Sequence, residues 1–160
     1  MQSGRIELTT HSPEETQSIG RTLGARALPG HVFLLVGELG AGKTCFTQGV
    51  LWGLGGNEYA RSPSYVLVSQ YPARMTMYHI DLYRLREPEE AIDLGLDEYL
   101  DGDGLAVVEW ADRVPGLFQG DHLRIRFEHL GEADRRLTLS ASALGYADLL
   151  DAARVGPSPG

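Results

Sequence analysis

Gly37-Glu38-Leu39-Gly40-Ala41-Gly42-Lys43-Thr44 is the stretch of this sequence that decides its fold. Its spacing, G-x-x-x-x-G-K-[ST], is that of a P-loop, and the apolar residues 32–36 directly before it predict the strand that such a loop follows. The glycines give the backbone conformations that a Cβ would forbid, so that successive N–H groups can surround an anionic oxygen. The stretch therefore predicts a loop that binds a nucleoside triphosphate through its phosphates.

Each polar position of this loop has a physical task. Lys43 brings an ammonium to the β- and γ-phosphates, Thr44 offers a hydroxyl to Mg²⁺, and the helix that begins here directs the positive end of its dipole at the phosphates. The 14 basic residues comprise one lysine, Lys43, and 13 arginines. A planar guanidinium would have the wrong shape at this position. The single ammonium therefore favours a P-loop over an accidental glycine-rich turn.

The bulk composition limits the kind of protein. A chain of 160 residues is expected to form one domain that buries roughly 70% of its unfolded surface; we predict an ATPase domain over residues 1–154 and a disordered tail over residues 155–160. A net charge of −8 with scattered arginines excludes a basic stripe, so contact with nucleic acid would be indirect. One cysteine and no long apolar run predict a cytoplasmic protein without membrane contact.

The periodicity predicts an α/β fold. Strands are expected at residues 5–9, 31–36, 66–68, 75–80, 105–108, 123–128 and 137–139. Helices are expected at residues 12–28, from the P-loop to about residue 54, at 87–94 and at 146–154. The apolar strands 31–36 and 105–108 are typical of a parallel sheet covered on both faces. The pattern predicts a single-domain P-loop NTPase with a mostly parallel central sheet flanked by helices and an antiparallel pair on one side.

Two acidic residues compete for the metal and base roles. Glu109 directly follows the apolar strand 105–108, which is the Walker B arrangement that places an acid by Mg²⁺ or its waters. Asp81 falls at the end of the run 75–80, where open α/β sheets collect their ligands. The residues leave open which of the two is the base. His79 is interpreted first as structural or supporting, and Trp110 either stacks on a base or partner or is a rim aromatic.

Two further observations concern the nucleotide. Cys45 lies in the first turn of the P-loop helix, a setting that lowers a thiol's pKa; we interpret it as a small filler, with the hypothesis that its alkylation blocks nucleotide binding. Guanine-binding switch proteins commonly use an Asn-Lys-x-Asp loop, and the only lysine here already belongs to the P-loop. Adenine, and therefore ATP, is favoured.

With these elements in place, the chain resembles the TsaE family, the small P-loop ATPases of bacterial threonylcarbamoyladenosine tRNA modification. The matching segments run from about residue 12 to residue 140, and His-x-Asp-Leu-Tyr-Arg-Leu together with Glu-Trp makes the resemblance specific. They are Gly37 to Thr44, Ser62-Pro63-Ser64-Tyr65, His79-Ile80-Asp81-Leu82-Tyr83-Arg84-Leu85, Leu94-Gly95-Leu96-Asp97-Glu98 and Glu109-Trp110. The sequence departs from the family at Ser64 and Cys45, where threonine is common, and at Ala111-Asp112-Arg113, where Pro-Glu-Arg is more frequent.

The resemblance implies an activity and a set of roles. Lys43 and the P-loop amides would hold ATP, Thr44 and Glu109 would hold Mg²⁺, and Asp81 would assist hydrolysis. Residues 62–65 would form a switch-like loop that responds to the γ-phosphate, and Arg135 matches a recurrent family arginine. Hydrolysis would be slow in the isolated chain and coupled to the other proteins of the threonylcarbamoyl transfer complex, which act on the adenosine next to the anticodon.

Two rival functions share the P-loop. A small-molecule kinase would need an acceptor pocket and a mobile lid that usually bears arginine, and residues 83–103 are too acidic and too short for that lid. A binding module that never hydrolyses ATP would need neither Asp81 nor Glu109. The sequence therefore favours an Mg²⁺-dependent ATPase that drives cycles of a protein complex.

Overall fold

The structure is a computed structural model. It describes residues 4–37, 42–60, 68–83, 85, 87, 89–90, 95–100, 102–111 and 120–155. Within these residues no helix is long and apolar enough to cross a membrane.

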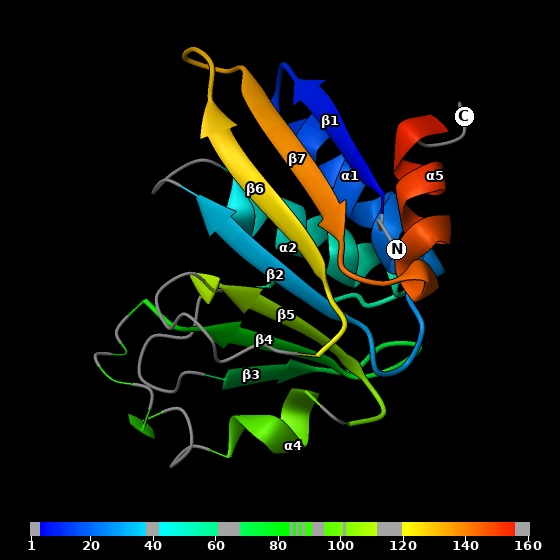
Figure 1. The fold of residues 1–160 in the computed structure, drawn as a ribbon, viewed down its shortest axis with the longest axis vertical. Coiled ribbons are helices and arrows are strands. Elements are labelled where there is room, and N and C mark those ends of the chain that lie inside the picture. Colours follow the sequence, from blue (N-terminus) through cyan, green and yellow to red (C-terminus); the bar gives the residue numbers. More distant parts are fainter. Residues whose placement is uncertain are drawn as a thin grey trace.

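A seven-stranded mixed sheet forms the centre of the molecule, in the order β1-β7-β6-β2-β5-β4-β3 (Figure 1). The neighbours β6, β2, β5 and β4 are parallel to one another, whereas β3, β7 and β1 extend the sheet in antiparallel fashion at its two edges. The strands are β1 Arg5–Thr10, β2 Val32–Gly37, β3 Val68–Tyr71, β4 Met77–Asp81, β5 Leu105–Glu109, β6 Leu123–His129 and β7 Arg135–Ala141. The predicted α/β fold is confirmed, and the predicted antiparallel pair, β6 and β7, also carries β1.

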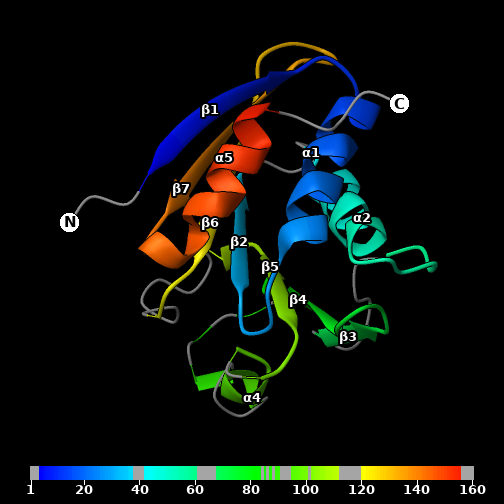
Figure 2. The ribbon, with the colours of Figure 1, turned by 90° about the vertical axis from the view of Figure 1, so that its right-hand side faces the viewer.

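Helices cover the two faces of the sheet unequally (Figure 2). One face packs on α1 Pro13–Arg26, α2 Lys43–Gly53 and α5 Ala147–Val155, the last preceded by a 3-10 turn at Leu144–Tyr146. The other face packs against α4 Leu96–Leu100 over the parallel strands. On β6 the side chains alternate between buried Leu123, Ile125 and Phe127 and exposed Arg124 and Arg126, as the period of two predicts.

Several predicted elements differ in their details. The hairpin of β3 and β4 is present, with Tyr71 opposite Met77, but residues 66 and 67 of the predicted first strand lie outside the described residues. Most of the predicted helix 87–94 also lies outside them, and helix α4 follows where the pattern had indicated no element. Val155 closes α5, while residues 156–160 of the predicted tail are not described, so the domain boundary stays a prediction.

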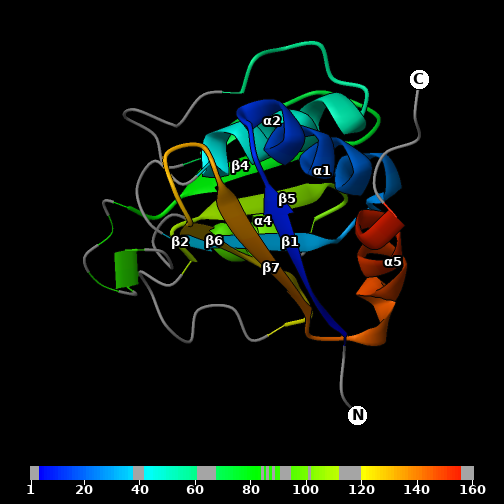
Figure 3. The ribbon, with the colours of Figure 1, turned by 90° about the horizontal axis from the view of Figure 1, so that it is seen from above.

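Helices α1 and α2 are in backbone contact, and Figure 3 shows them side by side. Each contributes two glycines spaced four residues apart, Gly20 and Gly24 on α1 and Gly49 and Gly53 on α2. A Cβ on Gly20 would lie 2.2 Å from the carbonyl oxygen of Phe46, and one on Gly49 would lie 2.0 Å from that of Gln17. Because no side chain separates the two backbones, α1 fixes the position of α2, the helix that begins at the P-loop.

The ends of α1 are capped from two parts of the chain. Ser12 caps the first turn, since its hydroxyl accepts a hydrogen bond from the Glu15 N–H at 3.1 Å. At the other end the Arg74 guanidinium donates to the carbonyls of Gly24 at 3.0 Å and Ala27 at 3.1 Å. A cation at these carbonyls complements the negative end of the helix dipole, and it joins the β3–β4 connection to α1.

Candidate nucleotide site

The P-loop leaves the central strand β2 and enters α2 through two glycines. Gly37 ends β2 with φ 138°, and a Cβ there would lie 2.4 Å from the Phe127 carbonyl oxygen. Gly42 precedes α2 with φ 104°. Both values lie in the region that favours glycine, so the structure supports the conformational reason for these two motif positions. Residues 38–41, which include Glu38, Leu39, Gly40 and Ala41, lie outside the described residues.

The first turn of α2 presents backbone donors. The N–H groups at the start of an α-helix have no acceptor within the helix, and the N-cap here is Gly42, which has no side chain to satisfy them. The turn comprises Lys43, Thr44 and Cys45, and the first intrahelical bond runs from the Phe46 N–H to the Gly42 carbonyl at 2.9 Å. Backbone donors at the positive end of a helix dipole suit an anion such as a phosphate group.

The Lys43 ammonium is held between the loop and an aromatic ring. Its Nζ donates to the Gly37 carbonyl at 2.9 Å and lies 3.6 Å from the centroid of the Trp110 ring. Lys43 is only 5% exposed. Trp110 has φ 60°, a left-handed conformation that is rare for a bulky residue and often found at functional sites. Trp110 therefore faces the P-loop lysine, a contact that the sequence did not predict.

Glu109 and Asp81 end two neighbouring parallel strands and pair with each other in the β4–β5 register. Leu105, Val107 and Glu109 alternate onto the face of the sheet that α2 covers. Glu109 is 3% exposed and accepts a hydrogen bond from Nε2 of the fully buried His79. The structure thus brings both predicted acids to the edge of the sheet where the P-loop begins, and it makes His79 the partner of Glu109.

The environment of Asp81 changes its acidity. Burial raises the pKa of this carboxyl, and the charge of Glu109 raises it further, against the opposing effects of the Tyr83 N–H, His79 and Lys43. The Tyr83 N–H donates to Asp81 Oδ1 at 2.9 Å. A carboxyl whose pKa is raised toward neutrality is better suited to accept a proton than an ordinary surface aspartate.

The expectation that the start of the helix lowers the pKa of Cys45 is wrong. Its pKa is raised, because burial disfavours the thiolate and the charge of Glu14 adds to this effect. Desolvation therefore outweighs the helix dipole that was expected to lower it. The thiol is half-buried, in keeping with the role of a small filler in the first turn.

The donor set fits ATP and Mg²⁺. Within the described part of the chain no group of three His, Cys, Asp or Glu side chains could hold a metal ion. Mg²⁺ at phosphate sites needs no such cage, because phosphate oxygens, waters and one or two side chains complete its shell. The Thr44 hydroxyl and the Glu109 carboxylate lie at the two elements that would supply those side chains, and Lys43 supplies a cation for the phosphates.

Three further positions were named in the sequence analysis. Residues 62–65 and Asp112 lie outside the described residues. The Arg135 guanidinium donates to the carbonyls of Gly131, Glu132 and Asp134 within the β6–β7 connection. Its contacts in the structure are therefore with its own turn.

One buried side chain beside the site was missed by the sequence analysis. Gln48 on α2 is 7% exposed. Its Nε2 donates to the Glu58 carbonyl at 3.1 Å, and its Oε1 accepts from the Ala60 N–H at 2.6 Å. A glutamine inside the helix after a P-loop is the only sequence signal of this contact, which attaches residues 58–60 to α2.

The strand, glycine-bounded loop and helix, with acids on the adjacent strand ends, define a P-loop protein of the α/β class. The family model described as "Threonylcarbamoyl adenosine biosynthesis protein TsaE" matches residues 10–137. The chain belongs to the TsaE family.

Individual relatives cover most of the chain. The tRNA threonylcarbamoyladenosine biosynthesis protein TsaE of Bacillus subtilis is 37% identical over 148 residues, 92% of each chain. The protein of the same name from Treponema pallidum is 36% identical over 135 residues, 84% of this chain and all of the relative. A crystal structure of YdiB from Bacillus subtilis superposes with a TM-score of 0.81 at 33% identity, covering 97% of both chains.

Proposed function

We propose that this protein is an Mg²⁺-dependent ATPase of tRNA threonylcarbamoyladenosine biosynthesis, and that ATP hydrolysis drives cycles of a partner protein complex in the cytoplasm. The observation that carries the proposal is the position of the Lys43 ammonium, which lies between the Gly37 carbonyl and the Trp110 ring on the helix that faces two strand-end acids. The pathway is that named for the TsaE proteins of Bacillus subtilis and Treponema pallidum.

Binding would rest on the P-loop. Lys43 and the first-turn amides of α2, including that of Cys45, would neutralise and hydrogen-bond the phosphate oxygens. Because Lys43 is 5% exposed, its charge acts in a medium of lower dielectric constant than water and is less screened. The motif residues 37–44 would together surround the triphosphate.

Hydrolysis would rest on positioning and on charge. Mg²⁺, when bound, neutralises charge on the transferred phosphoryl group. Thr44 and Glu109 would hold it, and the bond from His79 fixes the orientation of the Glu109 carboxylate. Asp81, with its raised pKa, would orient the attacking water and accept its proton. Glu109 is the alternative base. The roles of metal ligand and base are separated by measuring how hydrolysis depends on Mg²⁺ concentration in variants of Glu109 and of Asp81.

The proposal is tested by phosphate release from ATP. We expect the purified chain to release phosphate slowly by itself and faster with the other proteins of the threonylcarbamoyl transfer complex. The Lys43→Ala variant should release none. Transfer RNA alone should leave the rate unchanged, because its contact is proposed to be indirect. A rate that ignored the proteins and rose with a small hydroxylated metabolite would replace this proposal with a kinase.

A further inference from the structure

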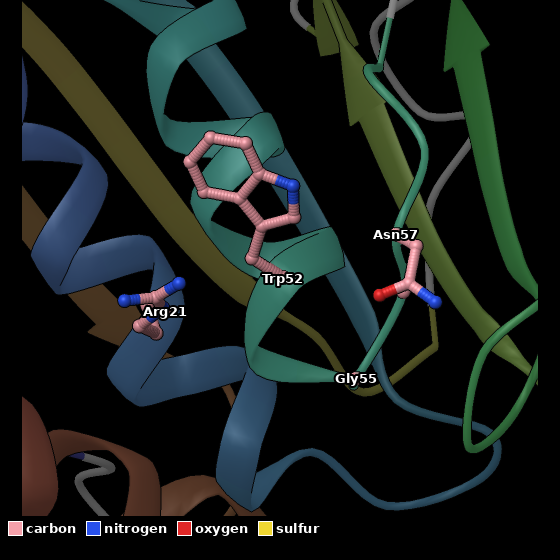
Figure 4. A pocket seen from close by; sticks show the side chains of 5 residues that line it. Arg21, Trp52, Gly55 and Asn57 are labelled. Atoms are coloured by element: carbon pink, nitrogen blue, oxygen red, sulfur yellow. The ribbon is translucent and has the colours of Figure 1, made fainter.

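A surface pocket lies at the opposite end of α2 from Lys43. It has a volume of about 380 Å³ and is lined by Arg21, Trp52, Gly55, Gly56 and Asn57. Figure 4 shows Arg21 on α1 and Asn57 on the segment after α2, on either side of the Trp52 indole. Its size falls within the range of pockets that receive a ligand or an anchoring side chain.

The pocket has the residues that dominate binding interfaces. The Arg21 guanidinium carbon lies 5.7 Å from the Trp52 ring centroid, and the Tyr59 ring meets that of Trp52 edge-on at 5.8 Å. Tyr59 is 71% exposed, the most exposed large hydrophobic side chain in the described part of the chain. Tryptophan, tyrosine and arginine are enriched among the few residues that supply most binding energy. We call the lining residues Arg21, Trp52 and Asn57, together with Tyr59 beside Trp52, the arginine–tryptophan pocket.

The charge of this pocket indicates the chemistry of its occupant. Arg21 forms no ion pair with any residue that the structure describes, and no acidic residue lies within four positions of it on α1. An exposed guanidinium over an indole favours a carboxylate, which it can bind with two parallel hydrogen bonds. A nucleic acid is disfavoured, because one cation on a chain of net charge −8 gives little attraction to a phosphate backbone.

The pocket is connected to the candidate nucleotide site through Gln48. This side chain binds the backbone of Glu58 and Ala60, on either side of Tyr59, and it belongs to the helix that begins at Lys43. In sequence, Ala60 leads directly into residues 61–67, which include the proposed switch residues 62–65. A protein bound at Tyr59 would therefore act on the start of that segment.

We propose that the arginine–tryptophan pocket docks the partner protein that controls hydrolysis, by receiving an acidic side chain of that partner against Arg21 while an apolar neighbour packs on Trp52 and Tyr59. This proposal rests on the proposed function for the identity of the partner. It adds the surface at which the partner binds and the segment, residues 58–60, through which binding reaches the nucleotide.

Binding and hydrolysis are measured separately to test it. Affinity for the proteins of the transfer complex is measured by titration calorimetry with the full chain, and phosphate release is measured with and without them. We expect Arg21→Glu and Tyr59→Ala each to weaken the affinity about tenfold or more and to lose the partner-dependent rate while keeping the basal rate. Arg26→Glu, the same charge change on the same helix, and Leu144→Ala, a 65% exposed side chain elsewhere, should behave as wild type.

Each outcome decides the question. Wild-type affinity in both Arg21→Glu and Tyr59→Ala overturns the docking surface, and so does a wild-type chain that binds none of these proteins. Loss of affinity in these two variants only, in a protein that shows no hydrolysis, supports the docking surface and overturns the proposed ATPase. If the variants instead lose affinity for transfer RNA alone, the pocket is a nucleic-acid site and the inference is wrong.

Discussion

Two regions of the molecule differ in the groups that they bury. One is the contact between α1 and α2, and the other is the edge of the sheet that carries the P-loop. The helix contact uses glycines, so that two backbones meet without any charged group between them. The strand edge buries Lys43, Glu109 and His79 and holds Trp110 in a left-handed conformation. Buried charge and backbone strain cost stability, whereas close apolar packing supplies it. The difference indicates that the helix pair stabilises a site that is itself destabilising.

The largest expected effect is on hydrolysis at the strand edge. Glu109→Gln keeps the side-chain volume and an oxygen that can accept from His79, but it removes the carboxylate charge. We expect the rate of phosphate release to fall about 1,000-fold, while nucleotide affinity changes only severalfold. Single-turnover assays and nucleotide titration measure the two quantities. Glu128→Gln on β6 is the matched control, and full activity in Glu109→Gln would show that the Glu109 carboxylate is needed neither for Mg²⁺ nor as the base.

The next effect separates binding from stability at the same edge. Lys43→Met retains the apolar stem and removes a buried cation, so we expect ATP affinity to fall about 100-fold and the melting temperature to be unchanged or higher. Calorimetric titration and thermal unfolding report both values on one sample. A variant that melted well below wild type would show that Lys43 stabilises the fold. That result would contradict the inference that the nucleotide site is destabilising.

The helix contact should respond in the opposite way. Gly24→Ala places a Cβ 2.2 Å from the Val50 carbonyl oxygen, and we expect the free energy of unfolding to fall by about 2 kcal/mol, because overpacking outweighs alanine's better helix propensity. Hydrolysis per folded molecule should persist at low temperature. Urea unfolding measures the change, with Gly145→Ala as control, since no atom lies within 4 Å of a Cβ there. Equal stability of the two variants would contradict the packing argument.

The smallest effect concerns the acidity of Asp81. Its pKa is raised in the folded state, so the folded protein holds this proton at pH values where the unfolded chain has lost it. The stability that this proton contributes is fully present at pH values below the ordinary pKa of an aspartate. It is lost as the pH rises through the pKa of Asp81 in the folded protein. We therefore expect Asp81→Asn to melt a few degrees higher than wild type at pH 7.

That advantage should disappear on acidification. Well below about pH 4 the aspartate is protonated in both states, so the variant and the wild type should melt together. Asp103→Asn, an exposed loop aspartate, should show no such dependence. A variant that is less stable than wild type at pH 7 would indicate that the Asp81 charge stabilises the fold, contrary to the direction of its pKa.

The sequence predicted those features that depend on local spacing. The loop-bounding Gly37 and Gly42, Lys43 at the start of α2 and the two strand-end acids follow from motif spacing and from apolar runs, and the structure places them at one edge of the sheet. Those predictions succeed because parallel strands bring their carboxyl ends together whatever their order along the sheet.

Other features depend on contacts between distant segments and leave little trace in periodicity. The pairing of β1 with β7, the bond from His79 to Glu109 and the contact of Trp110 with Lys43 each join residues at least 30 positions apart. The glycine contact of α1 and α2 could have been suspected from two four-residue glycine spacings, but only the structure shows that they face each other. The raised pKa of Cys45 depends on burial, which a helix-start rule does not include.

The position of β1 has a consequence for how the chain is made. Its residues, Arg5–Thr10, pair only with Arg135–Ser140 of β7 within the described sheet. On the ribosome this strand emerges well before its hydrogen-bonding partner, because the residues between Thr10 and Arg135 are translated in between. The glycine-packed helices can dock long before that, since their contacts lie about 30 residues apart, and closure of the sheet is left as a late, long-range step. Until β7 is translated, the nascent chain carries an unpaired strand that other chains could engage.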